Sequence, residues 1–155
     1  GKSTLLRIIL GLTSPSKGEV EYCKPNLQIS YLGHKNAIKH YLTPMQNLEL
    51  IFRSSALSEA IKWMHILGLN KVQDELTANL SFGQQKKLAL IRVFASESDL
   101  IILDEPFVGL DDASRDLLNG FLQKKLALDA SLILTSHIEP NILCSELVLS
   151  GDTDD

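Results

Sequence analysis

Apolar residues in this chain follow two patterns, short continuous runs and longer stretches with helical spacing, which together predict an α/β fold. The clearest run, Leu-Ile-Ile-Leu at residues 100–103, fits a strand buried on both faces inside a parallel sheet. Residues 132–135 predict a second buried strand. Shorter or alternating patterns predict strands at residues 19–22, 27–31 and 147–149, and the acidic tail 152–155 is expected to fray.

Helices are predicted where a capping residue precedes apolar positions spaced three or four apart. Thr43 is an N-cap candidate, with Pro44 at the first helical position and Gln46 completing a capping box. Ser81 and Gln84 form the same pattern at the start of another helix. The remaining predicted helices are residues 5–10, residues 58–67, and one capped by Asp111 or Asp112 that carries Leu117, Leu118, Phe121 and Leu122.

Composition narrows the class of protein. The chain has 155 residues, 45% of them hydrophobic, and a net charge of −4, which suits one domain and gives no reason to expect nucleic acid as a partner. No apolar segment approaches the roughly 20 residues of a membrane span. Cys23 and Cys144 lack metal-type spacing, which favours buried or incidental thiols in a reducing compartment. Because the first residue is Gly, we expect a piece of a longer chain.

Two carboxylates follow the clearest strand. Asp104 and Glu105 come directly after residues 100–103, and Pro106 cannot continue the ladder. Ligands of open α/β sheets bind just beyond the carboxyl ends of the strands, where two acids suit a hydrated Mg²⁺ and an attacking water. Taken alone, the same residues also fit a core strand that runs into an acidic turn.

The first four residues, Gly-Lys-Ser-Thr, open directly into a predicted helix and match the end of the phosphate-binding loop Gly-x-x-x-x-Gly-Lys-[Ser/Thr]. Gly1 would let backbone N–H groups approach phosphate, at a helix N-terminus that favours the anion. Lys2 would reach the β- and γ-phosphates of a nucleotide, and the Ser3 hydroxyl would bind Mg²⁺. An ordinary helix start has the same four residues.

Three further positions could contact a ligand, and each has a plain structural alternative. His137 follows the predicted strand 132–135, at an end where a side chain can face a ligand. His34 stands where a strand ends, and a lone histidine there is usually a satisfied core or surface residue. The Ser81 hydroxyl and the Gly83 N–H would form an anion site at a helix start, or simply belong to a well-capped helix.

Five motifs together resemble the ATP-binding subunit of an ABC transporter. They occur in the family's order and spacing over essentially the whole chain, at residues 1–4, 80–84, 100–106 and 109–111 and at His137. The resemblance implies a P-loop NTPase core, a parallel sheet flanked by helices, whose N-terminal strands are missing from this sequence. It implies one ABC-type ATPase domain over residues 1–155, partial at its N-terminus. A small helical subdomain, residues 42–98, would be inserted in it, and its stretch 43–68 resembles the permease-docking region.

By the same resemblance, the site would bind ATP and Mg²⁺ and hydrolyse ATP. Glu105 would be the general base that polarises the attacking water, and His137 would contact the γ-phosphate and help to place that water. The other implied positions are Gly1, Lys2, Ser3 and Thr4 for the phosphates, Ser3 and Asp104 for Mg²⁺, and Ser81, Gly83, Gln84 and Asp111 for the nucleotide and interface of a second ATPase subunit.

Two positions depart from the family pattern. Phe82 stands where the family usually has a Gly, beside the phosphate contact made across the dimer. His34 stands where the family has a Gln that senses Mg²⁺ and the water, so His34 joins the candidate catalytic residues. The aromatic residue that usually stacks on adenine would belong to the missing front of the domain.

A narrower resemblance rests on residues 31–39, Tyr-Leu-Gly-His-Lys-Asn-Ala-Ile-Lys, followed by Leu42 and Thr43. These are similar to the ATPase of the haem exporter that serves cytochrome c maturation. The similarity implies that ATP hydrolysis powers haem export, or release of a haem-loaded chaperone, with the haem handled by partners. It also implies a dimer of ATPase subunits on a membrane-embedded permease, peripheral on the cytoplasmic face of the inner membrane.

The motifs also fit three other functions. The chain could be an ABC ATPase for another cargo, or a binding-only regulatory subunit. It could also be a soluble ATPase of the ribosome-associated or DNA-repair kind. Only 45 residues separate His34 from Leu80, without heptads, whereas a chromosome-maintenance ATPase has a long coiled coil there. A parent chain near 200 residues would favour a transporter subunit, and one over 500 would exclude it.

Overall fold

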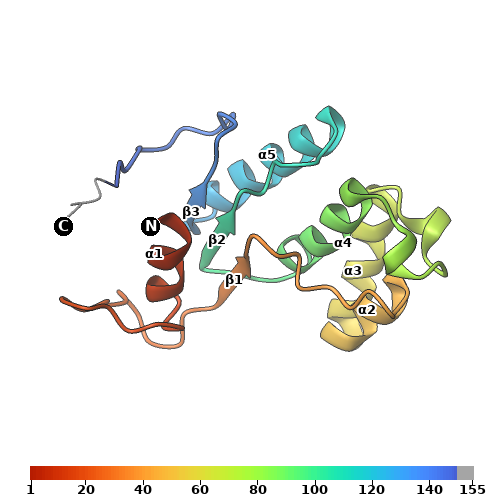
Figure 1. The fold of residues 1–155 in the computed structure, drawn as a ribbon, viewed down its shortest axis with the longest axis horizontal. Helices are drawn as coiled ribbons and strands as arrows, with labels where there is room; N and C mark the ends of the chain where they lie inside the picture. The colour runs from red at the N-terminus through yellow and green to blue at the C-terminus, as the bar shows by residue number, and fades with distance from the viewer. Residues whose placement is uncertain (150–155) are drawn as a thin grey trace, which may run out of the picture.

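The computed structural model describes residues 1–149 and is an α/β structure, as the sequence pattern predicts (Figure 1). The predicted fraying of the tail 152–155 lies outside the described residues. The helices are α1 (Lys2–Ile9), α2 (Pro44–Ile51), α3 (Ser54–Ile66), α4 (Phe82–Phe94) and α5 (Asp112–Ala127), with short 3₁₀ turns at Asn70–Val72 and Thr77–Asn79. The strands are β1 (Ile29–Leu32), β2 (Leu100–Asp104) and β3 (Ser131–Thr135).

The three strands form a parallel sheet in the order β1-β2-β3, so β2 lies in the centre. Every residue of β2 is buried, which confirms the prediction of a strand covered on both faces. Leu100 and Ile102 pack with Leu6 of α1 on one face, whereas Ile101 and Leu103 belong to the larger core on the other. This alternation follows from the period of two along a strand, with helices covering both faces of the sheet.

Helices α2, α3 and α4 gather at one end of the molecule, beyond the sheet (Figure 1). Thr43 and Ser81 begin α2 and α4 with complete capping boxes, as predicted, and Pro44 occupies the first position of α2. Met64 and Leu90 are fully buried between these helices and the sheet, in the same core as Leu118 of α5. The helices are therefore joined to the sheet by one continuous apolar core.

Two of the predicted strands are wrong. Residues 19–22 and 147–149 are not strands, and all seven of these side chains are exposed. Charged and apolar residues alternate at 19–22, but such a segment forms a strand only where a neighbouring strand pairs with its backbone N–H and C=O groups. Among residues 1–149, neither segment pairs with another strand.

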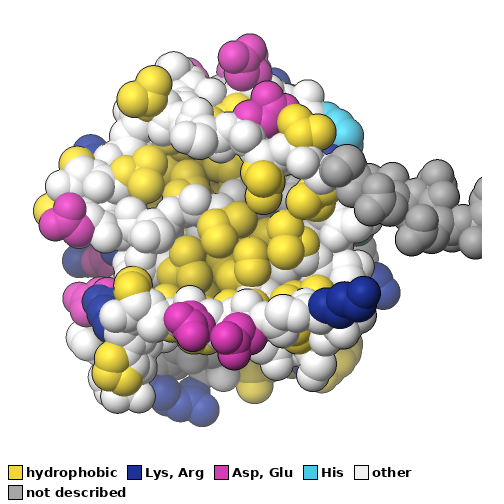
Figure 2. All heavy atoms as spheres, turned by 90° about the vertical axis from the view of Figure 1, so that its left-hand side faces the viewer, with side chains coloured by type: hydrophobic (Ala, Val, Ile, Leu, Met, Phe, Trp, Pro, Cys, Tyr) yellow, Lys and Arg dark blue, Asp and Glu magenta, His cyan; other side chains and the backbone are white. Residues whose placement is uncertain are grey.

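The side of the molecule that carries α1 has an apolar hollow (Figure 2). The small cluster around Leu6 on this side is completed by side chains that are only partly buried: Ile9, Leu10, Leu27, Tyr31 and Ile133. Both cysteines, Cys23 and Cys144, are free and exposed. No helix within residues 1–149 is both long enough and apolar enough to cross a membrane.

Candidate active site

The ends of β2 and β3 and the start of α1 meet at one edge of the sheet. The register places Asp104, the last residue of β2, beside Thr135, the last residue of β3. The first turn of α1 approaches the same edge, because the Ser3 hydroxyl donates a hydrogen bond of 2.8 Å to Asp104 Oδ2. The structure therefore brings the predicted phosphate-loop residues to the predicted carboxylates.

Asp104 is held by two hydroxyl groups. Its side chain is buried, and Thr135 Oγ1 donates a 2.6 Å hydrogen bond to Oδ1 while Ser3 binds Oδ2. Buried carboxylates are usually satisfied in this way, and here both oxygens are engaged. A carboxylate and a hydroxyl side by side are hard oxygen ligands of the kind that Mg²⁺ takes when it also binds nucleotide phosphates, so the residues present fit that ion.

Glu105 has an unusual backbone. Its φ of +50° lies in the left-handed region, which costs a residue with a side chain about 1–3 kcal/mol. Its backbone N–H donates to the carbonyl oxygen of Thr135 at 3.1 Å and to Thr135 Oγ1 at 3.2 Å. Thr135 therefore orients Asp104 through its side chain and Glu105 through its backbone. Strain of this kind is found where the surrounding structure fixes a functional side chain.

The Glu105 carboxylate faces Lys2 and His137. Glu105 Oε1 lies 3.9 Å from Lys2 Nζ and 3.5 Å from His137 Nε2, and the His137 backbone N–H donates to Oε2 at 3.2 Å. Lys2 Nζ and His137 Nε2 are themselves 3.3 Å apart. The Glu105 side chain is 14% exposed, against 46% for Lys2 and 80% for His137. The two basic groups therefore cover an acid that is largely shielded from solvent.

Other predicted residues are not in this cluster. His34 is exposed just beyond β1, and within residues 1–149 its side chain makes no hydrogen bond or ion pair. Gly1 is the N-cap of α1, and Thr4 lies exposed in its first turn. Ser81 and Gln84 bind each other at the start of α4, with Ser81 Oγ accepting from the Gln84 N–H at 3.2 Å. Within residues 1–149 the Ser81 hydroxyl accepts this bond and donates none.

The start of α4 packs against the turn that follows β2. A Cβ on Gly109 would overlap the ring of Phe82, and a Cβ on Gly83 would lie 2.8 Å from the Gly109 carbonyl oxygen. Lys87 Nζ binds Asp111 Oδ2 at 2.6 Å, and Asp111 in turn caps α5 by accepting from the Ser114 N–H. The hydrogen bond from Lys87 holds the pKa of Asp111 far below its usual range. Phe82 thus lies on the Gly109 turn, beside the predicted interface residues.

Two further residues near the site, Thr135 and Lys86, have no role predicted from the sequence. Thr135 binds both carboxylate residues. Its place at the end of a predicted strand, two positions before His137, marks it as a residue near the site but does not indicate these contacts. Lys86 of α4 is only 3% exposed. Burial lowers the pKa of its ammonium group, while attraction from Asp104 and Glu105 raises it. A lysine in a run of polar residues gives no signal of burial.

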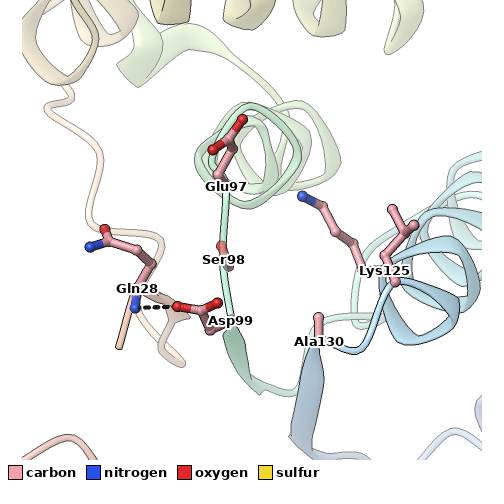
Figure 3. A pocket seen from close by; sticks show the side chains of 7 residues that line it. Gln28, Glu97, Ser98, Asp99, Lys125 and Ala130 are labelled. Carbon is pink, nitrogen blue, oxygen red and sulfur yellow. Dashed lines mark hydrogen bonds between the residues drawn. The ribbon is translucent and has the colours of Figure 1, made fainter. Parts of the chain in front are cut away.

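A shallow pocket lies at the other end of the sheet (Figure 3). It is lined by residues that precede the three strands or lie near the end of α5, among them Gln28, Ser98, Asp99, Lys125 and Ala130. The backbone N–H of Gln28 donates to the Asp99 carboxylate there. Because this pocket is at the amino ends of the strands, it is separate from the cluster around Glu105.

The lysine and serine at the start of α1, set against an Asp-Glu pair at the end of a central parallel strand, define the class of the P-loop NTPases. A family model described as "ABC transporter" matches residues 1–108. The chain belongs to this family, and it is an ATP-binding, ATP-hydrolysing cassette of the kind that such transporters couple to transport.

Curated relatives indicate which kind of ABC transporter protein the chain is similar to. One relative is the "Cytochrome c biogenesis ATP-binding export protein CcmA" of Idiomarina loihiensis. The two sequences are 38% identical over an alignment 167 positions long, which covers 99% of this chain and 72% of the relative. This chain is 36% identical to the protein of the same name from Dechloromonas aromatica, covering 92% and 76%. A dimeric ATP-binding cassette in a post-hydrolysis state, bound to ADP and phosphate, has the same fold. That match has a TM-score of 0.73 at 23% identity and covers 89% of this chain and 70% of the solved one.

Proposed function

We propose that this chain is the ATP-hydrolysing subunit of an ABC exporter that serves cytochrome c biogenesis. Hydrolysis would power haem export, or release of a haem-loaded chaperone, and the haem would be handled by partner proteins. The observation that carries the proposal is the 38% identity to a cytochrome c biogenesis export protein over 99% of this chain. The cluster of Lys2, Glu105 and His137 supports an active rather than a binding-only subunit.

The first turn of α1 would hold the nucleotide. Gly1, Lys2, Ser3 and Thr4 would bind its phosphates through the helix N-terminus and the Lys2 ammonium, and Ser3 and Asp104 would hold Mg²⁺. When bound, ATP supplies the phosphoryl group and Mg²⁺ offsets phosphate charge. The Ser3–Asp104 hydrogen bond of 2.8 Å already sets the two oxygen ligands side by side.

Glu105 would act as the general base. Its carboxylate is 14% exposed and oriented by the His137 backbone N–H, so it is positioned to accept a proton from water. Lys2, now 3.9 Å from Glu105, would turn to the phosphates, and His137 would contact the γ-phosphate and the water. His34 would approach the water only if the loop after β1 moves, because no contact links it to the cluster within the described residues.

A second ATPase subunit would complete each site. Ser81, Gly83 and Gln84 at the start of α4 would face the nucleotide bound by that subunit, with Asp111 in the interface. The free N–H groups at the start of α4 favour an anion. Helices between residues 42 and 98 would form the subdomain that docks on the membrane-embedded permease, at the cytoplasmic face of the inner membrane.

The test is a haem stain for c-type cytochromes in cells whose only copy of the full gene encodes Glu105→Gln. We expect mature c-type cytochromes to disappear while b-type haem proteins persist, because the variant binds ATP but lacks its base. Glu97→Gln is the matched control, since Glu97 is an exposed carboxylate in the pocket at the opposite end of the sheet. Protein levels are checked by blot.

Normal cytochromes in cells with abundant Glu105→Gln protein would contradict the export function. A purified wild-type protein that hydrolyses ATP would then be an ABC ATPase for another cargo. Loss of cytochromes with Glu97→Gln as well would indicate an effect on protein level instead of on the base.

A further inference from the structure

His137 meets Glu105 through a side chain that packing does not hold. The His137 side chain is 80% exposed, yet its Nε2 lies 3.5 Å from Glu105 Oε1. Its backbone N–H donates to Glu105 Oε2 at 3.2 Å. Functional side chains keep their geometry when packing or supporting hydrogen bonds hold them in place. Because packing holds this ring so little, its approach to Glu105 depends on the backbone that carries it.

Ser136 holds that backbone in a local turn. The Ser136 hydroxyl accepts a hydrogen bond from the Ile138 N–H at 3.0 Å and donates one to the Ile138 carbonyl oxygen at 2.5 Å. A serine that binds the backbone two residues further on forms an ST turn. The residue enclosed by this turn is His137.

Both ends of the turn are anchored in the fold. Thr135, the last residue of β3, is buried and lies beside Asp104 in the register of the sheet. On the other side of the turn, the Ile138 side chain packs against the larger core. The half-buried Ser136 hydroxyl therefore ties the exposed His137 to two points that belong to the sheet and to the core.

We propose that Ser136 is a positioning residue for ATP hydrolysis, which acts by fixing the backbone of His137. The inference rests on the roles proposed above for Glu105 and His137. With the turn closed, the His137 N–H holds one oxygen of Glu105 and the ring approaches the other from a fixed direction. Without the hydroxyl, both backbone groups of Ile138 lose the hydrogen bonds that they make within residues 1–149, and the segment can turn His137 away.

The first test measures steady-state ATP hydrolysis by the full parent chain. Ser136→Ala opens the turn, and we expect kcat to fall about 10- to 100-fold, because small displacements of catalytic groups have effects of this size. KM for ATP should stay close to that of wild type, since Lys2 and Ser3 would bind the phosphates. Ser136→Thr keeps the hydroxyl and should restore most of kcat. Ser96→Ala is the matched control, because its half-buried hydroxyl also binds a backbone carbonyl oxygen, that of Arg92, but precedes the start of β2.

Amide hydrogen exchange separates positioning from a general loss of structure. In Ser136→Ala the His137 amide should exchange about five- to tenfold faster, while the amides of β2 keep their wild-type protection. If the alanine variant does not fold, Ser136→Cys is measured against Ser136→Thr in the same two assays.

Three results would overturn the inference: a wild-type kcat in Ser136→Ala, a kcat in Ser136→Thr as low as in Ser136→Ala, or equal loss of protection at His137 and in β2. A wild-type kcat in His137→Ala would instead overturn the role proposed for His137.

Discussion

The ring of Phe82, the first residue of α4, lies over Gly109 in the turn between β2 and α5. Gly109 has a φ of +81°, and a Cβ there would overlap the ring. Two independent constraints therefore require glycine at position 109, the backbone conformation and the aromatic neighbour. The side chain that departs most from the family pattern is accommodated by a contact with the turn after the catalytic strand.

Gly109→Ala should destabilise the protein by about 1–3 kcal/mol, because alanine is strained at positive φ and its methyl group displaces the Phe82 ring. Chemical denaturation measures the loss. Adding Phe82→Ala should recover the part due to overlap, so the two substitutions will not be additive. Gly120→Ala is the control, since this glycine lies in α5 with nothing within 4 Å of the new methyl group, and it should stabilise by about 0.5–1 kcal/mol. Equal losses at both glycines would contradict the argument.

Local sequence patterns predicted the elements that depend on local chemistry. The capping boxes at Thr43 and Ser81 and the buried strand β2 are as predicted, because caps and strand periodicity act over a few residues. Residues 19–22 have the alternation of a strand but no pairing partner within the described residues, and a partner cannot be read from the segment itself. The motif order identified Asp104 and Glu105 as site candidates.

The contacts that hold those candidates could not be predicted. Thr135 reaches Asp104 only because β2 and β3 are neighbours in one particular register. The contact between Phe82 and Gly109 and the burial of Lys86 depend on how α4 lies against the turn after β2. Such long-range placement is set by the packing of the whole core and leaves no mark on the local pattern.

Thr135→Val should reduce both stability and ATP hydrolysis. It leaves Asp104 without its 2.6 Å hydrogen bond and removes one of the two acceptors of the Glu105 N–H. Leaving a buried acceptor without its hydrogen-bond partner costs about 1–3 kcal/mol, and more when the acceptor is charged. We expect kcat to fall more than nucleotide affinity, since Thr135 orients the carboxylates and not the phosphate loop. Thr135→Ser keeps the hydroxyl and should retain most activity. A valine variant with wild-type kcat would show that this hydroxyl is dispensable.

Lys87→Met should change how stability depends on pH. The hydrogen bond from Lys87, followed by those from Ser114, lowers the pKa of Asp111 in the folded protein. A carboxyl group with a lowered pKa stabilises the fold above its unfolded pKa, near 4, and this contribution is lost as the pH falls toward the folded value. Melting temperatures between pH 2 and 7 should therefore decline less steeply with acid in Lys87→Met, from a lower value at pH 7.

Lys62→Met is the control for the Lys87–Asp111 ion pair. Lys62 and Glu59 form a 3.0 Å pair on the surface of α3 with both side chains well exposed, and such pairs contribute little to stability. Its melting curve should follow that of wild type across the same pH range. Parallel curves for wild type and Lys87→Met would contradict the proposed effect of Lys87 on Asp111.

The single tryptophan reports on the junction of α3, α4 and α5. Trp63 stacks on Phe94 with ring centroids 4.4 Å apart, and Phe121 meets both rings edge-on. Phe94→Ala should cost about 3–5 kcal/mol, because it opens a cavity in this cluster, and it should shift Trp63 emission to longer wavelength. Phe82→Ala is a control on the same helix, since Phe82 is 59% exposed and should change stability little. If Phe94→Ala is as stable as Phe82→Ala, the three helices are not joined through these rings.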